Sequence, residues 1–207
     1  DIMVGHPLYV GTWGTHGVRA ANFAIQKADY VVAIGTRLDT KATGSPASSF
    51  APKACLIMVD IDQNELDKME KIGKSCHHTV CSDAKSYMQY LFITDQEKVL
   101  KKGVFEDWWG LIRGWQKDYP AVDPSSALGS PYRVMQELSK YLTPEDIVVS
   151  DTGCPLAWAM QVLPFKGRFI HAFTQTPMGY GLGAAIGAAG ETKGRVILLT
   201  GDGGLSE

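Results

Sequence analysis

Residues 195–204 of this 207-residue chain read RVILLTGDGG. The apolar run from Val196 to Leu199 is followed closely by Asp202, which stands between glycines. A short run of this kind predicts a strand buried in a parallel sheet, and ligands of α/β proteins bind beyond the carboxyl ends of such strands. We therefore expect an α/β fold in which Asp202 faces a ligand crevice.

The glycines around Asp202 indicate the chemistry of that ligand. Backbone without side chains can approach a phosphate closely, and Mg²⁺ takes a few hard oxygens from the protein while sharing the others with phosphate. Gly201, Gly203 and Gly204 together with Asp202 therefore predict a Mg²⁺–diphosphate site. Because the chain ends three residues after Gly204, we expect the next helix to be missing and the second sheet domain to be truncated.

The composition is typical of a soluble protein, with 45% hydrophobic and 20% charged residues. A net charge of −2 with scattered basic residues provides no surface for nucleic acid or an anionic membrane. No apolar run approaches the roughly 18 residues of a membrane span, and the first residues do not resemble a signal peptide. We expect a cytoplasmic protein with no nucleic-acid or membrane partner.

The four cysteines are dispersed, which does not indicate a disulfide framework. Residues 76–81 read CHHTVC, so a soft-metal site is one interpretation. The spacing matches no standard zinc pattern, and a second ligand pair is lacking elsewhere in the sequence. The segment is therefore better explained as a strand or loop between two helices, with one histidine exposed.

Helices and strands alternate through residues 1–94, which predicts a small α/β domain with a parallel sheet covered on both faces. Asp62 and Ser82 are the expected N-caps of its two later helices. The expected elements are a helix at 18–28, strands at 30–34 and 55–59, and helices at 63–71 and 83–92.

Residues 95–129 combine a helical pattern with glycines, prolines and serines, and we interpret them as a connector. Residues 130–207 begin a second domain, with Ser130 as N-cap and Pro131 at the first helical position. Its expected elements are a helix to about residue 141, strands at 147–149, 168–170 and 196–199, and helices near Ala157 and Gly183. The fold class is thus two α/β domains with parallel sheets flanked by helices.

The glycines of the second domain also permit a different function. Gly179, Gly181 and Ala184 match the dinucleotide-binding fingerprint, with Asp202 about 20 residues further on as a ribose-binding acid. This pattern predicts an NAD-type dehydrogenase. Against it, residues 174–177 separate the first glycine from the preceding strand, whereas the fingerprint glycine should form the turn directly after the strand. Close helix packing explains the glycines better.

Several motifs together resemble the thiamine-diphosphate-dependent enzymes of the acetolactate synthase and pyruvate oxidase group. In the second domain they are Gly201-Asp202-Gly203-Gly204, Met178-Gly179-Tyr180-Gly181-Leu182 and Asp151-Thr152-Gly153. In the first domain they are His16-Gly17, Ala21-Asn22, Ala28-Asp29, Gly35-Thr36-Arg37-Leu38-Asp39, Thr43-Gly44, Phe50-Ala51-Pro52 and Asp60-Ile61-Asp62. The resemblance covers nearly the whole chain and implies a central domain followed by the first part of the diphosphate-binding domain.

The resemblance implies roles for residues of the second domain. Asp202 would be a Mg²⁺ ligand, and the amides of Gly203 and Gly204 would lie beside the diphosphate of the cofactor. Met178 would hold the cofactor bent, and the carbonyl of Thr176 would receive its 4′-amino group. Asp151, Thr152 and Gly153 would form a further diphosphate contact, although typical acetolactate synthases have a glutamine–histidine pair at this loop.

The resemblance also implies an FAD site in the first domain. The matching positions are Gly35, Arg37, Asp39, Lys41, Asp60 and Ile61. The chain departs from the family at Thr40 and Lys41, where an acid and an arginine are usual, and at Trp13 and Thr15. FAD, an ADP group, or no ligand at all remain open for this domain.

The implied reaction is a Mg²⁺- and thiamine diphosphate-dependent decarboxylation of a 2-oxo acid, with transfer of the acyl unit to a second carbonyl. Such enzymes serve branched-chain amino acid biosynthesis and form homodimers or homotetramers. The family's catalytic glutamate lies upstream of Asp1, so we expect this segment alone to be inactive. Another thiamine diphosphate lyase or decarboxylase, the dehydrogenase, and a non-catalytic nucleotide-binding module are the alternatives.

Overall fold

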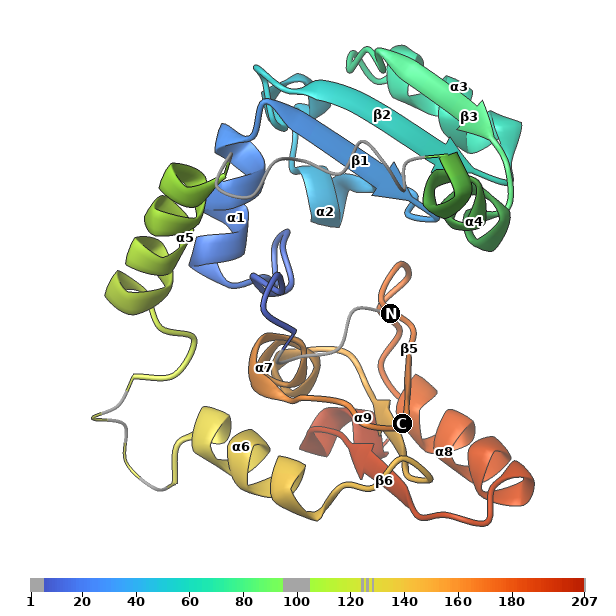
Figure 1. The fold of residues 1–207 in the computed structure, drawn as a ribbon. Coiled ribbons are helices and arrows are strands. Elements are labelled where there is room, and N and C mark those ends of the chain that lie inside the picture. The colour runs from blue at the N-terminus through green and yellow to red at the C-terminus, as the bar shows by residue number, and fades with distance from the viewer. Residues whose placement is uncertain (1–5, 95–104, 124, 126, 128, 207) are drawn as a thin grey trace. The chain divides into compact units, whose positions relative to one another are not determined.

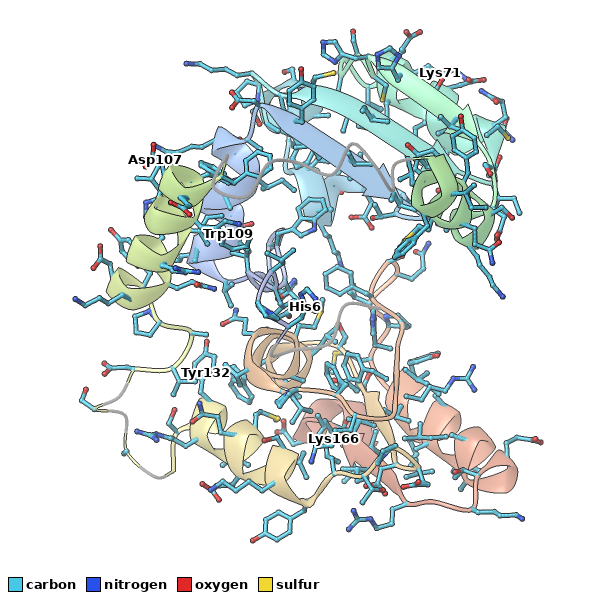
Figure 2. The ribbon with its side chains drawn as sticks, in the orientation of Figure 1. His6, Lys71, Asp107, Trp109, Tyr132 and Lys166 are labelled. Atoms are coloured by element: carbon cyan, nitrogen blue, oxygen red, sulfur yellow. The ribbon has the colours of Figure 1, made fainter. Side chains whose placement is uncertain are left out.

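A computed structural model of the protein describes residues 6–94, 105–123, 125, 127 and 129–206 (Figure 1). The chain forms two compact units, each built around a three-stranded parallel sheet. Among the described residues, the β1–β3 unit comprises 13–15, 19–94 and 105–119. The β4–β6 unit comprises 6–12, 16–18, 120–123, 125, 127 and 129–206. Two α/β units with parallel sheets flanked by helices confirm the predicted fold class.

The first sheet has the strand order β1-β2-β3. Its strands are β1 (Tyr30–Ile34), β2 (Cys55–Asp60) and β3 (His78–Cys81). The register pairs Tyr30 with Cys55 and Ile57 with His78, so the carboxyl ends of all three strands lie at one edge. The two predicted strands are confirmed, and β3 confirms that residues 76–81 contain a strand. Both His77 and His78 are exposed, so the expectation of a single exposed histidine is wrong.

The helices of this unit are α1 (Arg19–Lys27), α2 (Thr40–Thr43), α3 (Gln63–Lys71) and α4 (Ala84–Thr94), with the 3₁₀ turn η1 at Ala47–Ser49. Leu56 and Met58 of β2 pack with Leu66 and Met69 of α3 in the core. On β1, Tyr30 and Val32 are exposed, so the expectation of a sheet covered on both faces is wrong at this strand.

Two predicted caps have different outcomes. The Asp62 side chain accepts the N–H of Asn64 at 2.9 Å, which confirms it as the N-cap of α3. For α4 the predicted cap, Ser82, is wrong by one residue: Asp83 accepts the N–H of Ser86 at 3.0 Å. A carboxylate bonds the free amides of a helix start at least as well as a hydroxyl does.

Helix α5 (Glu106–Asp118) was predicted within the connector, and it packs against α1 in the β1–β3 unit. Phe23 of α1 makes edge-to-face contacts with Trp115 and Tyr119. Trp115 in turn makes an edge-to-face contact with Trp108. These aromatic contacts hold α5 against α1, although Gly110 and Gly114 interrupt its helical pattern in the sequence.

The second sheet has the order β5-β4-β6, with β4 (Ile147–Ser150) between β5 (Arg168–His171) and β6 (Val196–Leu199). All four residues of β4 are buried, whereas all four residues of β6 are partly exposed. The prediction of the β6 strand is confirmed, but the prediction that it is fully buried is wrong, because it lies at the edge of this sheet.

Helices cover both faces of the second sheet. Helices α6 (Pro131–Tyr141) and α7 (Cys154–Val162) share a core with Val148, Ile197 and Leu199. Helix α8 (Tyr180–Glu191) packs on the opposite face, where Gly181 approaches Leu198. The helix that was expected to be missing begins in this chain as α9 (Asp202–Ser206). Across the described ranges, each helix is too short or too polar to span a bilayer.

Candidate functional site

The connections that follow β4, β5 and β6 meet around one buried carboxylate, that of Asp151. Asp151 directly follows β4, and its side chain is 1% exposed. Its Oδ1 accepts the N–H of Thr152 at 2.8 Å, and its Oδ2 accepts the N–H of Gly179 at 2.9 Å and the hydroxyl of Thr200 at 3.4 Å. The carboxylate thus joins the starts of the β4–α7 and β6–α9 connections to the start of α8.

Close backbone packing explains two glycines of this group. A Cβ on Gly204 would overlap Oδ2 of Asp151. A Cβ on Gly181 would lie 2.9 Å from both the Cβ of Asp151 and the Cδ1 of Leu198. In contrast, a Cβ on Gly183 or Gly187 would meet nothing within 4 Å in the described part of the chain. The predicted close helix packing is therefore confirmed for Gly181, whereas Gly183 and Gly187 have no close neighbour among the described residues.

The segment between β5 and α8 holds the two residues predicted to contact the cofactor rings. Thr176 has a φ of 48°, and its N–H donates to the carbonyl of Ala172 at 2.8 Å. Met178 is 51% exposed, and its Cε would lie 2.6 Å from a Cβ on Gly203. The structure therefore brings Met178 and Gly203 together at the surface, next to the Asp151 group.

Asp202 is exposed at the first position of α9. Its carboxylate forms no ion pair with any residue that the structure describes. No three His, Cys, Asp or Glu side chains gather into a metal cage within residues 6–94, 105–123 and 129–206. An exposed, unpaired carboxylate beside glycines fits a Mg²⁺ ion that takes most of its oxygens from a diphosphate and water.

The loop of Asp151, Thr152 and Gly153 leads directly into α7. Gly153 is the N-cap residue, with a φ of 91° that favours glycine, and it supplies no side-chain cap. The first amides of α7 therefore lack a side-chain acceptor from this cap, as suits a helix start beside an anion. Asp151 differs from its two neighbours, because its carboxylate is already engaged with protein donors.

Three of the six predicted nucleotide-contact residues of the β1–β3 unit, Gly35, Asp60 and Ile61, lie at the carboxyl edge of the first sheet. The N–H of Gly35 donates to the carbonyl of Val59 at 2.8 Å, which places Gly35 beside the end of β2. There Asp60 is 8% exposed and accepts the N–H of Asp62 at 3.0 Å, and Ile61 is 73% exposed. Asp39 caps the short helix α2 by accepting the amides of Lys41 and Ala42.

The guanidinium of Arg37 is paired with the carboxylate of Glu65. Its Nε and Nη2 donate to Oε1 of Glu65 at 3.1 and 2.8 Å, and Lys68 pairs with Oε2 of the same carboxylate. The hydrogen bond from Lys68 and that from Arg37 hold the pKa of Glu65 below its ordinary value. A phosphate at Arg37 would therefore compete with Glu65, although the Arg37 side chain is 62% exposed.

The geometry also tests the dinucleotide fingerprint. β5 ends at His171 and α8 begins at Tyr180, so Gly179 caps a helix at the end of a long connection. Gly181 packs closely against Asp151 and Leu198 of the sheet. Asp202 lies in α9, beyond the end of β6. These positions do not match the strand–turn–helix that the fingerprint requires.

Two family models match the chain, one on each sheet unit. The model for "Thiamine pyrophosphate enzyme, central domain" matches residues 2–91. The model for "Thiamine pyrophosphate enzyme, C-terminal TPP binding domain" matches residues 151–207, which begin at the buried carboxylate. The chain belongs to the thiamine pyrophosphate enzymes.

Within this family the chain is similar to acetolactate synthase large subunits. It is 34% identical over 202 residues to that of Cyanidium caldarium, covering 95% of this chain and 34% of the relative. It is 30% identical over 204 residues to the isozyme 1 large subunit of Escherichia coli K12, covering 97% of this chain and 34% of the relative. The chain therefore spans about a third of the length of these relatives.

Sequence reasoning missed two members of the candidate thiamine pyrophosphate site. Thr200 donates its hydroxyl to Asp151, and Gly179 donates its N–H to the same oxygen. Thr200 could have been predicted as a member of the site, because it follows β6 directly and precedes the glycines. The Gly179 contact joins residues 28 apart and has no local signal.

Proposed function

We propose that this chain supplies the thiamine diphosphate and Mg²⁺ site of an acetolactate synthase-like enzyme. The enzyme would decarboxylate a 2-oxo acid and transfer the acyl unit to a second carbonyl. Thiamine diphosphate, when bound, supplies the nucleophilic carbon and the electron sink for decarboxylation. The residues of this chain bind and orient that cofactor.

One observation carries the proposal: Met178, Gly203 and Asp151 belong to three different segments that follow β5, β6 and β4, and yet they lie within one small group of contacts. Glycine backbone that can approach a diphosphate, an exposed carboxylate for Mg²⁺ at Asp202, and an apolar side chain beside them are the parts such a site needs. In this assignment Asp202 holds the metal, and the amides of Gly203 and Gly204 lie beside the diphosphate. Met178 supports the rings, and the Thr176 carbonyl receives the amine.

The test is calorimetric titration of thiamine diphosphate into the natural polypeptide that contains these residues, with and without Mg²⁺. Asp202→Asn should abolish the Mg²⁺-dependent part of binding, because an amide is a weaker ligand for this hard ion than a carboxylate. Glu191→Gln removes an exposed acid at the end of α8 and should leave binding unchanged. Mg²⁺-dependent binding that survives Asp202→Asn would contradict the assignment.

For the β1–β3 unit we propose an adenine nucleotide, FAD or an ADP group, at the carboxyl edge of its sheet. Gly35, Asp60 and Ile61 lie together there, with Arg37 close by in sequence. The guanidinium of Arg37 suits a pyrophosphate once it exchanges Glu65 for phosphate oxygens. Flavin absorbance of the purified protein, compared between wild type and Arg37→Ala, tests this site.

The remaining expectations concern the whole enzyme and stay predictions: a homodimer or homotetramer, a cytoplasmic location, and a role in branched-chain amino acid biosynthesis. The relatives' printed name, acetolactate synthase, supports the last of these. The choice between acetolactate formation and another decarboxylation or lyase reaction is tested by product analysis with pyruvate as substrate.

A further inference from the structure

Asp151 differs from Asp202 and Met178 of the candidate site because its side chain is buried. It is 1% exposed, whereas Asp202 and Met178 are exposed. Both of its carboxylate oxygens accept hydrogen bonds, from the N–H groups of Thr152 and Gly179 and from the hydroxyl of Thr200. Little of this side chain is accessible to a ligand.

The donors that hold the Asp151 side chain are two backbone N–H groups and one hydroxyl. In the described part of the chain, no Lys, Arg or His forms an ion pair with it. Hydrogen bonds to a charged acceptor are stronger than neutral ones, and a buried carboxylate that loses a donor is strongly destabilised. The position of each donor is therefore coupled to that of the carboxylate.

The donors belong to connections that carry the proposed cofactor contacts. Gly179 directly follows Met178, and Thr200 precedes Gly201 by one residue. Gly204 packs so closely on Oδ2 that a Cβ has no room. The carboxylate therefore sets the distance between the start of α8 and the glycines of α9, and with it the place where Met178 meets Gly203.

We infer that Asp151 is a positioning residue, which holds the start of α8 and the glycine turn of α9 in register for the cofactor without touching it. This inference rests on the proposed function. It gives Asp151 an indirect role in place of the diphosphate contact predicted from the sequence.

The test compares Asp151→Asn with Asp146→Asn in the natural polypeptide. Asp146 is a matched control, because it is 3% exposed, precedes the same strand at its other end, and binds Arg195 and Thr143. Amide hydrogen exchange without cofactor should accelerate about tenfold or more at Gly179 in Asp151→Asn and remain unchanged there in Asp146→Asn.

The second readout is the Mg²⁺-dependent affinity for thiamine diphosphate. It should fall about 10- to 100-fold in Asp151→Asn, as for other groups that orient ligands indirectly, and stay unchanged in Asp146→Asn. Thr200→Val removes one donor without burying a new charge, and should give a smaller loss in the same direction. This variant keeps the test valid if Asp151→Asn fails to fold.

The possible results separate the two proposals. Unchanged affinity in Asp151→Asn and Thr200→Val would overturn the positioning role, as would an equal loss of affinity in Asp146→Asn. A wild-type protein that binds no thiamine diphosphate, with or without Mg²⁺, would contradict the proposed function itself.

Discussion

The Oδ2 atom of Asp151 accepts a hydrogen bond from the backbone nitrogen of Gly179 at 2.9 Å, although 28 residues separate the two in the chain. The contact joins the end of β4 to the start of α8. Gly179 has φ 81° and ψ −14°, a left-handed conformation that costs glycine little. The direction in which α8 leaves the sheet therefore depends on a carboxylate from another strand, and so does the placement of Met178.

The contact between Gly204 and Asp151 predicts that Gly204→Ala is harmful. The added methyl would overlap a buried carboxylate that is held by three donors, so backbone or side chain must shift. We expect a loss of about 1–3 kcal/mol in the free energy of unfolding, measured by urea denaturation, together with weaker thiamine diphosphate binding.

Two further glycines are the controls for this substitution. Gly187→Ala adds a methyl inside α8 where the described residues leave open space, and it should stabilise the protein by about 0.5–1 kcal/mol. Gly203→Ala displaces only the flexible end of Met178 and should cost less than Gly204→Ala. A Gly204→Ala variant as stable as wild type would contradict the observed packing.

A second prediction concerns acid sensitivity at the other end of β4. Asp146 accepts from Nε and Nη2 of Arg195 at 2.9 and 2.7 Å and from the N–H of Thr143 at 2.7 Å. These bonds, the Arg195 pair first, hold the pKa of Asp146 well below its usual range. The unfolded chain takes up this proton near pH 4, so the stabilisation is present above about pH 4 and is lost as the pH falls further.

Asp146→Asn should therefore be less stable than wild type at neutral pH, and the difference should shrink in acid. Urea denaturation at about pH 7, 5 and 3 measures both curves. If the two curves run parallel over this range, the Asp146 carboxylate is not the group that Arg195 stabilises.

The strands could be predicted because their signals are local. Val196–Leu199 and Tyr30–Ile34 are short apolar runs ended by glycine or a hydroxyl residue, and both strands begin and end where the sequence predicts. Asp62 caps α3 by accepting the N–H of Asn64, only two residues further on, so that prediction also needed no tertiary knowledge. The degree of burial of β6 was harder to predict, because it depends on which strands lie beside β6 in the sheet.

The candidate site could be predicted only as a set of residues. From the sequence we predicted Asp151, Thr152 and Gly153 together as ligand contacts. The hydrogen bond between the Asp151 carboxylate and the N–H of Gly179 joins residues 28 apart, and no local pattern predicts it. Likewise, the pairing of Arg37 with Glu65 brings together residues from two different connections. The direction of a side chain and the choice between a ligand and a protein group as its partner depend on tertiary structure. The periodicity of the sequence does not predict either of them.

A third prediction concerns His171, which lies between Phe169 and Phe173 in a row of aromatic rings. Its Nδ1 is buried without a hydrogen-bond partner among the described residues, and burial lowers the pKa of the imidazole. The folded state thus resists protonation, whereas the unfolded chain takes up the proton near pH 6.5. The stabilisation from this site is complete above about pH 6.5, and it is lost as the pH falls below that value through the lower pKa of the folded state.

His171→Phe should remove this loss, because a phenyl ring extends the aromatic row and does not titrate. The melting temperatures of wild type and variant should be closest near pH 8 and should diverge near pH 5, with the variant the more stable. A constant difference across this range would show that His171 does not titrate between the two states.

A fourth prediction tests the competition at Arg37. Glu65→Gln removes the carboxylate that binds the guanidinium, so a pyrophosphate should bind Arg37 more readily. Because the Arg37 side chain is 62% exposed, we expect a gain of at most about fivefold in flavin affinity. Fluorescence titration with FAD measures it. Glu70→Gln, an exposed acid on the same helix, is the control and should have no effect.

The last prediction concerns Thr176, whose φ of 48° lies in the left-handed region. That conformation costs a non-glycine residue about 1–2 kcal/mol, and glycine avoids the cost while losing about 0.5–1 kcal/mol through the entropy of the unfolded chain. Thr176→Gly should therefore leave stability unchanged or raise it by up to about 1.5 kcal/mol. It keeps the backbone carbonyl proposed to receive the cofactor amine, so affinity for thiamine diphosphate should also persist. Thr176→Val keeps the shape and removes the hydroxyl, so a large loss of affinity in both variants would assign the contact to the hydroxyl and contradict the role of the carbonyl.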